Sequence, residues 1–226
     1  MIVVMLSESM QDYLKTIYEI VQNGDRATTN ALADSLGVTA ASVTGMLKKL
    51  AELNLVEYER YQGVMLTNAG QKIALSVVRH HRLIELYLTE AMGFSWDRVH
   101  DEADRLEHAI SEEFVDKVSD ILGNPQRDPH GSPIPSKDGH VAIASHLALS
   151  NVPIGHTVQV ERVTDENPAV LRTIAELGLL PRVVLKVTGQ DAATNTVNIT
   201  VISRGSSLQQ YSVQRDLADN IFVTES

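Results

Sequence analysis

The sequence predicts an α+β protein built from three successive parts, and three observations lead to this prediction. Apolar residues recur at spacings of three and four over residues 12–122, which is typical of amphipathic helices. Runs rich in valine and isoleucine dominate residues 155–226, which favours a small SH3-like β-barrel. Five of the seven prolines lie within residues 123–154, so this segment is expected to be a turn-rich connector.

Residues 1–72 are expected to form a helix-turn-helix followed by a hairpin. A helix over residues 12–22 precedes a second helix, which Thr29 caps and Gly37 ends, and a third helix, which Thr39 caps. The short connector 37–39 is typical of a helix-turn-helix. Two β-prone runs, 56–61 and 64–67, flank a Gly turn, so the sequence predicts a winged helix-turn-helix.

The rest of the chain divides by composition. Residues 73–135 are expected to be all-helical up to about residue 122, with helices over 69–91, 96–110 and 111–122. Residues 136–154 are expected to be a linker. Residues 155–226 contain four β-prone runs and one helix over 169–177, and they are expected to form the small barrel.

Composition excludes several classes of protein. Cysteine is absent, which excludes disulfides, cysteine-ligated metal and a thiol nucleophile, and is consistent with a cytoplasmic location. No apolar run reaches the roughly 18 residues of a transmembrane helix, so no membrane partner is expected. Residues 73–140 contain seven Lys and Arg against thirteen Asp and Glu, together with six of the eight histidines. Acid and imidazole together indicate a cation-binding segment, and a solvated acidic helix is the alternative.

The third helix of residues 1–72 has the side chains that a DNA-reading helix needs. Small and hydroxyl-bearing residues at its start suit base edges in the major groove, and basic residues further along suit phosphates. The candidate DNA-binding residues are Thr39, Ala41, Ser42, Thr44, Lys48 and Lys49, with Arg60 and Tyr61 on the wing. The alternative is an ordinary helical fold in which Thr39 is only a cap, since the chain carries a net charge of −10.

Residues 100–108 have metal-ligand spacing. His100, Asp104, Glu107 and His108 stand three and four apart, so on a helix they share a face, and Asp12 is a candidate ligand from another element. Such an oxygen-rich set suits Mn²⁺ or Fe²⁺. A second group could form a further site: His81 and Glu85, Asp128 and His130, and Asp165. Phosphate-loop, serine-hydrolase and zinc-protease motifs are absent, so an enzyme is not expected, although a metallohydrolase remains an alternative.

The chain resembles the diphtheria-toxin-repressor (DtxR) family of metal-dependent transcriptional regulators, and most closely its manganese-responsive branch. The resemblance covers roughly residues 8–135 and is carried by the stretches 12–19, 66–70, 81–85, 99–103, 106–108 and 128–135. Residues 177–181 resemble the family's C-terminal SH3-like (FeoA-type) domain more loosely. The resemblance implies a winged helix, an all-α dimerisation domain and this barrel.

The resemblance also implies three sets of metal ligands. The primary set is Asp12, Asp104, Glu107 and His108; the secondary set is Glu85, Asp128, His130 and Asp165; an ancillary set adds His81 and His100 to Glu85. Iron-type members have Met and Cys at the places of Asp12 and Asp104, so oxygen at both implies manganese. The chain departs from manganese members at Asp128, where some have Cys, and at Lys15, where compact members have Glu.

The function that the resemblance implies is a homodimeric, Mn²⁺-dependent repressor of metal-uptake genes that binds a palindromic double-stranded operator. Apolar dimer contacts are expected around residues 83–88 and 106–118. An Fe²⁺-dependent repressor of the same architecture is the first alternative. A metal-buffering protein that does not bind DNA is the alternative from another class, and the helix over residues 39–49 counts against it.

Overall fold

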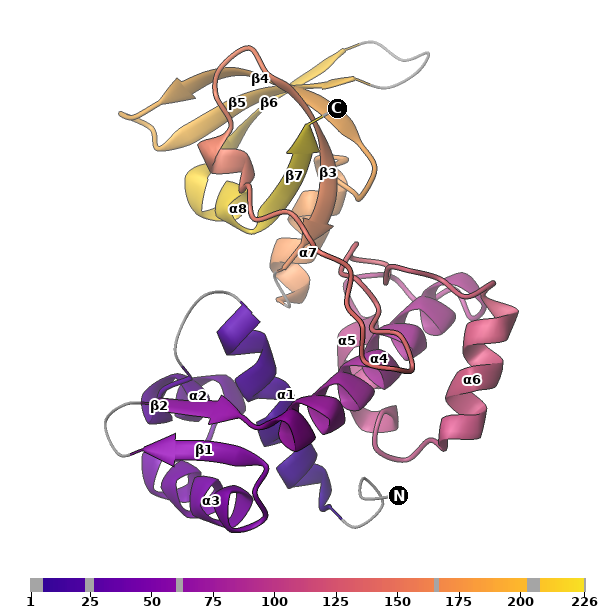
Figure 1. Ribbon diagram of the computed structural model, residues 1–226. Coiled ribbons are helices and arrows are strands. Elements are labelled where there is room, and N and C mark those ends of the chain that lie inside the picture. Colours follow the sequence, from indigo (N-terminus) through magenta and orange to yellow (C-terminus); the bar gives the residue numbers. More distant parts are fainter. Residues whose placement is uncertain (1–5, 23–26, 60–62, 165–166, 203–207, 226) are drawn as a thin grey trace. The chain divides into compact units, whose positions relative to one another are not determined.

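A computed structural model describes residues 6–22, 27–59, 63–164, 167–202 and 208–225 (Figure 1). The chain forms two compact units, Met1–His80 with Pro135–His140, and His81–Ile134 with Val141–Ser226. The long helix α4 (Asn68–Glu90) contributes its first half to one unit and its second half to the other. Among the helices described, none combines the length and the hydropathy that crossing a membrane requires.

The first unit contains the expected helix-turn-helix. Its helices are α1 (Glu8–Gln22), α2 (Thr29–Leu36) and α3 (Ala40–Glu52). The cap of α2 is Thr28 rather than Thr29, since the Thr28 side chain accepts a hydrogen bond from the Ala31 amide. Gly37 ends α2 with φ of 63°, a left-handed conformation that glycine adopts without strain. Thr39 caps α3, as predicted.

The hairpin of the first unit pairs β1 (Val56–Glu59) with β2 (Gly63–Leu66) in antiparallel register. Ala27 adds an isolated bridge to Val64, which ties the chain before α2 to the hairpin. The apolar stripes that the sequence predicted face one core, in which Leu14, Leu32 and Leu47 are fully buried. The predicted winged helix-turn-helix is therefore the fold of this unit.

In the second unit, α4 packs against α5 (Val99–Leu106) and α6 (Glu112–Ile121). Leu83 and Leu86 form a core with Val115 and Val118, so these residues, which were expected at the dimer contact, are buried within their own chain. The helix expected over residues 96–110 is shorter than predicted, since it begins at Val99. It ends at Leu106, and residues 107–109 form a turn.

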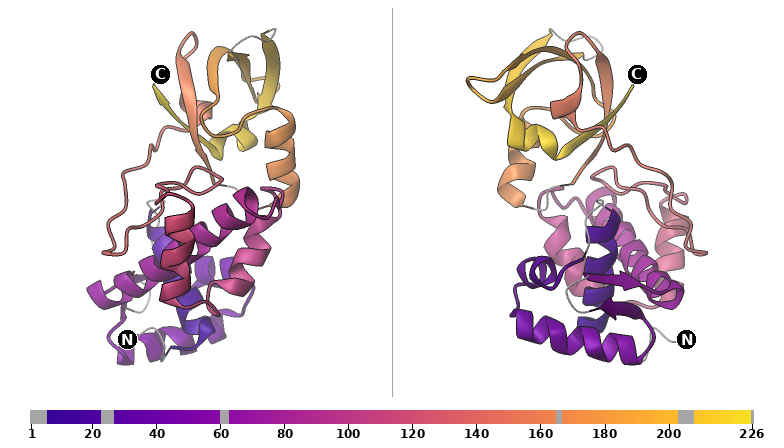
Figure 2. Two further views of the ribbon diagram at one scale, coloured as in Figure 1. Left: turned by 90° about the vertical axis from the view of Figure 1, so that its right-hand side faces the viewer. Right: turned by 60° about the vertical axis from the view of Figure 1, so that its left-hand side comes forward.

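The described part of the C-terminal β-domain contains five strands: β3 (Thr157–Val163), β4 (Val184–Asp191), β5 (Thr196–Ile202), β6 (Gln209–Gln214) and β7 (Ile221–Glu225). All neighbours are antiparallel in the order β6-β5-β4-β3-β7, and the sheet is strongly curved (Figure 2). A short 3-10 helix (Leu149–Asn151) and the helices α7 (Pro168–Glu176) and α8 (Arg215–Asp219) complete the domain. Strand β6 and helix α8 were not predicted.

Candidate metal centre

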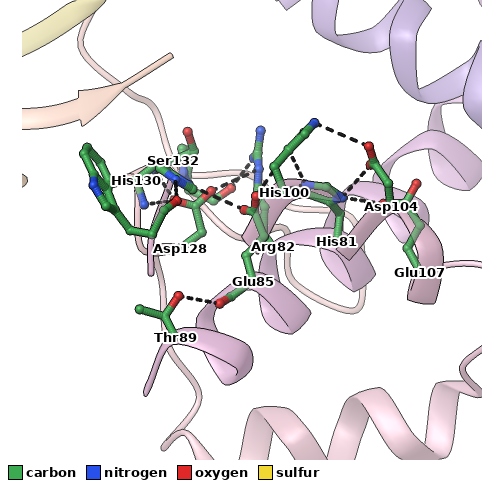
Figure 3. Close-up of polar contacts among 12 residues, drawn as sticks. His81, Arg82, Glu85, Thr89, His100, Asp104, Glu107, Asp128, His130 and Ser132 are labelled. Atoms are coloured by element: carbon green, nitrogen blue, oxygen red, sulfur yellow. Dashed lines mark hydrogen bonds and ion pairs between the residues drawn. The ribbon is translucent and has the colours of Figure 1, made fainter. Parts of the chain in front are cut away.

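His81, in the second half of α4, lies at the centre of a first group of polar side chains (Figure 3). Its Nδ1 is 2.5 Å from Glu107 Oε2 and 3.2 Å from Asp104 Oδ1. Its Nε2 is 3.1 Å from His100 Nδ1 and 3.1 Å from Glu85 Oε1. We call His81, His100, Asp104 and Glu107 the α5 cluster, because α5 or the turn after it supplies three of them.

The α5 cluster combines helical spacing with a turn. His100 and Asp104 lie four residues apart on α5, and His100 Nε2 is 3.5 Å from Asp104 Oδ2, as the sequence pattern predicted. Glu107 and His108 follow the end of the helix, with His108 Nε2 3.3 Å from Glu107 Oε1. The turn buries Glu107 to 3% exposure against His81. Helical spacing therefore positions His100 and Asp104, whereas the turn after α5 positions Glu107 and His108.

A second group is fully enclosed, and we call it the buried cluster: Glu85, Asp128 and His130, at 3%, 7% and 8% exposure. One potential ligand atom from each residue lies within 4.8 Å of the others. Glu85 Oε2 is 3.7 Å from His130 Nδ1, while Glu85 Oε1 faces His81. Glu85 therefore touches both clusters, one with each carboxylate oxygen.

Asp128 is held by its own loop. Its Oδ1 accepts hydrogen bonds from the amides of His130, at 2.8 Å, and Ser132, at 2.9 Å. Its Oδ2 lies 3.6 Å from Arg82 Nε (Figure 3). Arg82 was not predicted as part of a site, although its position next to His81 was the available signal.

The electrostatics of the buried cluster favour a bound cation. Burial alone would raise the pKa of Glu85, but the surrounding histidines, with the charge of His81 foremost, hold that pKa well below its ordinary value. Burial and the charge of Glu85 raise the pKa of Asp128. Burial opposes protonation of His130, yet Glu85 and Asp128 raise its pKa to about 9. The two buried carboxylates thus favour a positive charge at His130, and they would favour a bound cation for the same reason.

The donor set fits a hard or borderline divalent ion. Two carboxylates and one imidazole offer oxygen and nitrogen without sulfur, which suits Mn²⁺ or Fe²⁺ better than Cu⁺. Buried carboxylates of like charge are costly unless a cation or hydrogen bonds compensate them. His81, His100 and Asp104 also bring ligand atoms within 4.8 Å of one another. Both clusters are therefore able to take a metal.

Two further predicted metal ligands, Asp12 and Asp165, come from other parts of the chain. Asp12 lies on α1 in the first unit and is half-buried. Asp165, Arg60 and Tyr61 lie outside the described residues.

Most candidate DNA-binding residues of α3 and its cap are exposed, as contact with DNA requires. Thr39, Ala41, Ser42, Lys48 and Lys49 are exposed. The Thr39 hydroxyl caps the helix, with its Oγ1 3.1 Å from Ser42 Oγ. Thr44, partly buried, donates its hydroxyl to the Ala40 carbonyl. The cap uses one lone pair of the Thr39 hydroxyl, so this exposed hydroxyl is able to make a further hydrogen bond.

Comparison with family models divides the chain into three matches. Residues 5–64 match the iron-dependent repressor N-terminal DNA-binding domain. Residues 67–136 match the iron-dependent repressor metal-binding and dimerisation domain. Residues 147–225 match the FeoA domain.

Individual relatives and solved structures agree with these matches. The transcriptional regulator MntR of Oceanobacillus iheyensis is 34% identical over 118 residues, which are 52% of this chain and 80% of the relative. The iron-dependent repressor IdeR of Mycobacterium leprae is 28% identical over 209 residues, 87% of this chain and 90% of the relative.

Among solved structures, a manganese-dependent transcriptional repressor in complex with manganese is 35% identical, with a TM-score of 0.90 over 96% of this chain and 100% of that one. The apo form of the manganese-activated repressor ScaR has a TM-score of 0.80 at 29% identity, over 95% of this chain and all of that one. The fold, the two carboxylate–histidine clusters and these matches agree: the chain belongs to the diphtheria-toxin-repressor family of metal-dependent, DNA-binding transcriptional regulators.

Proposed function

We propose that the chain is a homodimeric repressor that Mn²⁺ activates to bind a palindromic operator upstream of metal-uptake genes. The observation that carries this proposal is the pair of neighbouring clusters, in which carboxylates and histidines provide every candidate ligand and sulfur provides none. Oxygen and imidazole donors suit Mn²⁺. Two of the similar proteins described above are named for their dependence on manganese or activation by it.

For the primary ion we propose the ligands Asp12, Asp104, Glu107 and His108. The contact between Glu107 and His108 and the half-exposed side chain of Asp104, at 47%, support this set, because the α5 cluster remains accessible to a further ligand. Asp12 lies on α1, in the unit that carries the DNA-reading helix. An ion held by Asp12 and by the α5 cluster would favour one orientation of that helix. The ion would then bind this orientation more tightly, which is the differential affinity that metal activation requires.

For a second ion we propose the buried cluster, completed by Asp165. The donor atoms and charges of Glu85, Asp128 and His130 support this site. His81 and His100 form the ancillary set with Glu85, and their contacts with its Oε1, at 3.1 and 3.4 Å, support that assignment.

For DNA we propose that Thr39, Ala41, Ser42 and Thr44 read base edges, and that Lys48 and Lys49 contact phosphates. Arg60 and Tyr61 are proposed at the wing. For the homodimer we propose that a second copy covers α6, where Phe114 and Ile121 are 46% and 70% exposed. These two residues are seven apart and so share one helical face.

An Fe²⁺-dependent repressor is the second candidate, and the similarity to the iron-dependent repressor IdeR favours it. Fe²⁺ binds most nitrogen and oxygen sites more tightly than Mn²⁺ does, so donor type alone does not separate the two ions. Titrating each ion anaerobically against operator binding separates them.

The test is operator binding measured by fluorescence anisotropy with and without Mn²⁺, on DNA from upstream of metal-uptake genes. We expect Mn²⁺ to increase affinity, and Asp12→Ala to remove this increase while the protein still sediments as a dimer. Lys48→Ala and Lys49→Ala should each reduce the salt dependence by about one phosphate contact. Lys186→Ala, on strand β4, is the matched control. Binding of Asp12→Ala with the wild-type Mn²⁺ dependence would contradict the proposed primary site.

A further inference from the structure

We propose that the C-terminal β-domain sets the metal affinity of the buried cluster, by holding His130 in position through Trp96 and strand β3. In this view the β-domain is a structural part of the metal sensor and not only an appended module. The inference rests on the proposed metal-dependent function, since it concerns one of the two proposed sites.

The orientation of the His130 ring is determined by Trp96. His130 Nε2 lies 2.8 Å from the Trp96 carbonyl oxygen. Because a carbonyl only accepts hydrogen bonds, Nε2 keeps its proton, and Nδ1 is the nitrogen that remains for a cation. The two rings are stacked, with centroids 5.1 Å apart and an interplanar angle of 28°. The imidazole is therefore held both by a hydrogen bond and by a flat aromatic surface.

Trp96 is in turn held by the β-domain. Its side chain packs against the apolar core of that domain. The next residue, Asp97, is buried and pairs with Arg172 on α7, with Arg172 Nη1 2.9 Å from Asp97 Oδ2. The Trp96 carbonyl is thus anchored from its side chain and from its neighbour. A shift of α7 would be transmitted to the acceptor of the His130 hydrogen bond.

The backbone of the loop that carries the ligands is also in direct contact with β3. The Val163 amide donates to the His130 carbonyl at 2.9 Å. Gly131 has φ of 89°, and a Cβ at this position would lie 2.0 Å from the Glu161 carbonyl oxygen. Arg127 bridges the two segments, with Nη2 2.6 Å from Glu161 Oε1 and Nη1 2.6 Å from the Gly131 carbonyl. Only glycine permits this approach.

Ligands that are fixed in this way bind more tightly, because less reorganisation is needed on binding. Loss of a contact that orients a ligand typically lowers metal affinity 10- to 100-fold. Coupling is reciprocal, so an ion in the buried cluster should in turn strengthen the contact between the loop and β3.

Trp96 is the only tryptophan in the chain, so its emission is a local reporter of the buried cluster. The first experiment titrates the full-length protein with Mn²⁺ and follows Trp96 emission, together with free Mn²⁺ by electron paramagnetic resonance. Arg172→Ala should raise the Mn²⁺ concentration at the midpoint of the Trp96 emission change about tenfold. Arg172→Lys should restore most of the lost affinity. The Mn²⁺ affinity of the α5 cluster, the second class of site, should be unchanged. Arg105→Ala, which removes an exposed ion pair, with Glu102 at 2.7 Å, is the control.

A second variant tests the backbone contact. Gly131→Ala should weaken the buried site more than Arg172→Ala does, because the loop must move away from Glu161. Gly123→Ala is the control: its φ is 73°, similarly unfavourable for alanine, but no atom lies within 4 Å of the added Cβ. In the metal-free protein, amide exchange at Val163 should be faster in Gly131→Ala than in Gly123→Ala. In the wild type, Mn²⁺ should slow that exchange.

Two outcomes would overturn the inference: wild-type Mn²⁺ affinity at the buried site in both Arg172→Ala and Gly131→Ala, or equal weakening of both classes of site, which would indicate general destabilisation. A different outcome would count against the proposed function instead. If Asp128→Asn and the wild type bind Mn²⁺ identically, the buried cluster is not a metal site.

Discussion

The buried cluster and the α5 cluster differ in how completely the chain encloses them. Glu85, Asp128 and His130 are all less than 9% exposed. In the α5 cluster the side chains of Asp104 and His100 are 47% and 22% exposed. The same residue types thus form one enclosed cluster and one that is open to solvent on one side. Enclosure by the chain, more than ligand chemistry, therefore distinguishes the buried cluster from the α5 cluster.

This difference has electrostatic consequences. Charges in the buried cluster interact at low effective dielectric, so each one shifts the pKa of its neighbours. Charges near Asp104 are screened by water. We therefore expect substitutions in the buried cluster to have large effects on both metal binding and stability, and substitutions at the exposed edge of the α5 cluster to have smaller ones.

The largest effect is expected from Glu85→Gln, because Glu85 touches both clusters. Loss of its charge should lower the Mn²⁺ affinity of the buried cluster by more than about 100-fold, since a ligand matters more than the residues that orient it. The α5 cluster should weaken less. Electron paramagnetic resonance of free Mn²⁺ measures both, and Glu90→Gln on the same helix is the control. A loss of Mn²⁺ affinity at the α5 cluster alone would contradict the expected order of the two clusters.

Stability without metal gives the next largest contrast. His130→Gln removes the positive charge that compensates two buried carboxylates, and breaking such a buried pair costs about 3–5 kcal/mol. His100→Gln, at a partly exposed position, should cost about 1 kcal/mol or less. Urea denaturation of the metal-free proteins compares the two. Equal losses would show that enclosure does not set the strength of these interactions.

The raised pKa of His130 predicts a pH dependence with a definite sign. Because the pKa rises from 6.5 unfolded to about 9 folded, protonated His130 stabilises the metal-free fold fully below pH 6.5. This contribution is lost as the pH rises through 9, so the deficit of His130→Gln should shrink over that range. Mn²⁺ must displace the proton, so calorimetry at pH 7.5 in different buffers should show about one proton released at the buried site.

The smallest effect concerns metal preference at the open cluster. Asp104→Cys replaces a carboxylate by a softer thiolate, so the balance should shift from Mn²⁺ towards Co²⁺. Competition between the two ions, measured by operator binding, should show this shift while the buried site keeps its affinity. Unchanged relative activation by Mn²⁺ and Co²⁺ would argue that Asp104 is not a ligand.

Local features of the chain were predictable from its residues. The caps and breaks around Gly37 and Thr39 and the apolar stripes of α1 to α4 depend on neighbours within one or two turns. The pairing of His81 with Glu85 and of His100 with Asp104 follows from i, i+4 spacing. Strand β6 was missed because its residues are mostly polar, with only Val213 buried.

By itself, the sequence determined the winged helix, the helical segment, the β-rich end and the residue types that we propose as metal ligands. Periodicity, capping and residue type are local properties of a chain. Only the tertiary structure decided which of those residues meet. Glu85 and His130 are far apart in sequence, and Glu107 reaches His81 from a turn where a helix was expected. The orientation of His130 depends on Trp96 and Val163, on either side of it in sequence. Such contacts are set by packing of distant segments, which no local pattern encodes.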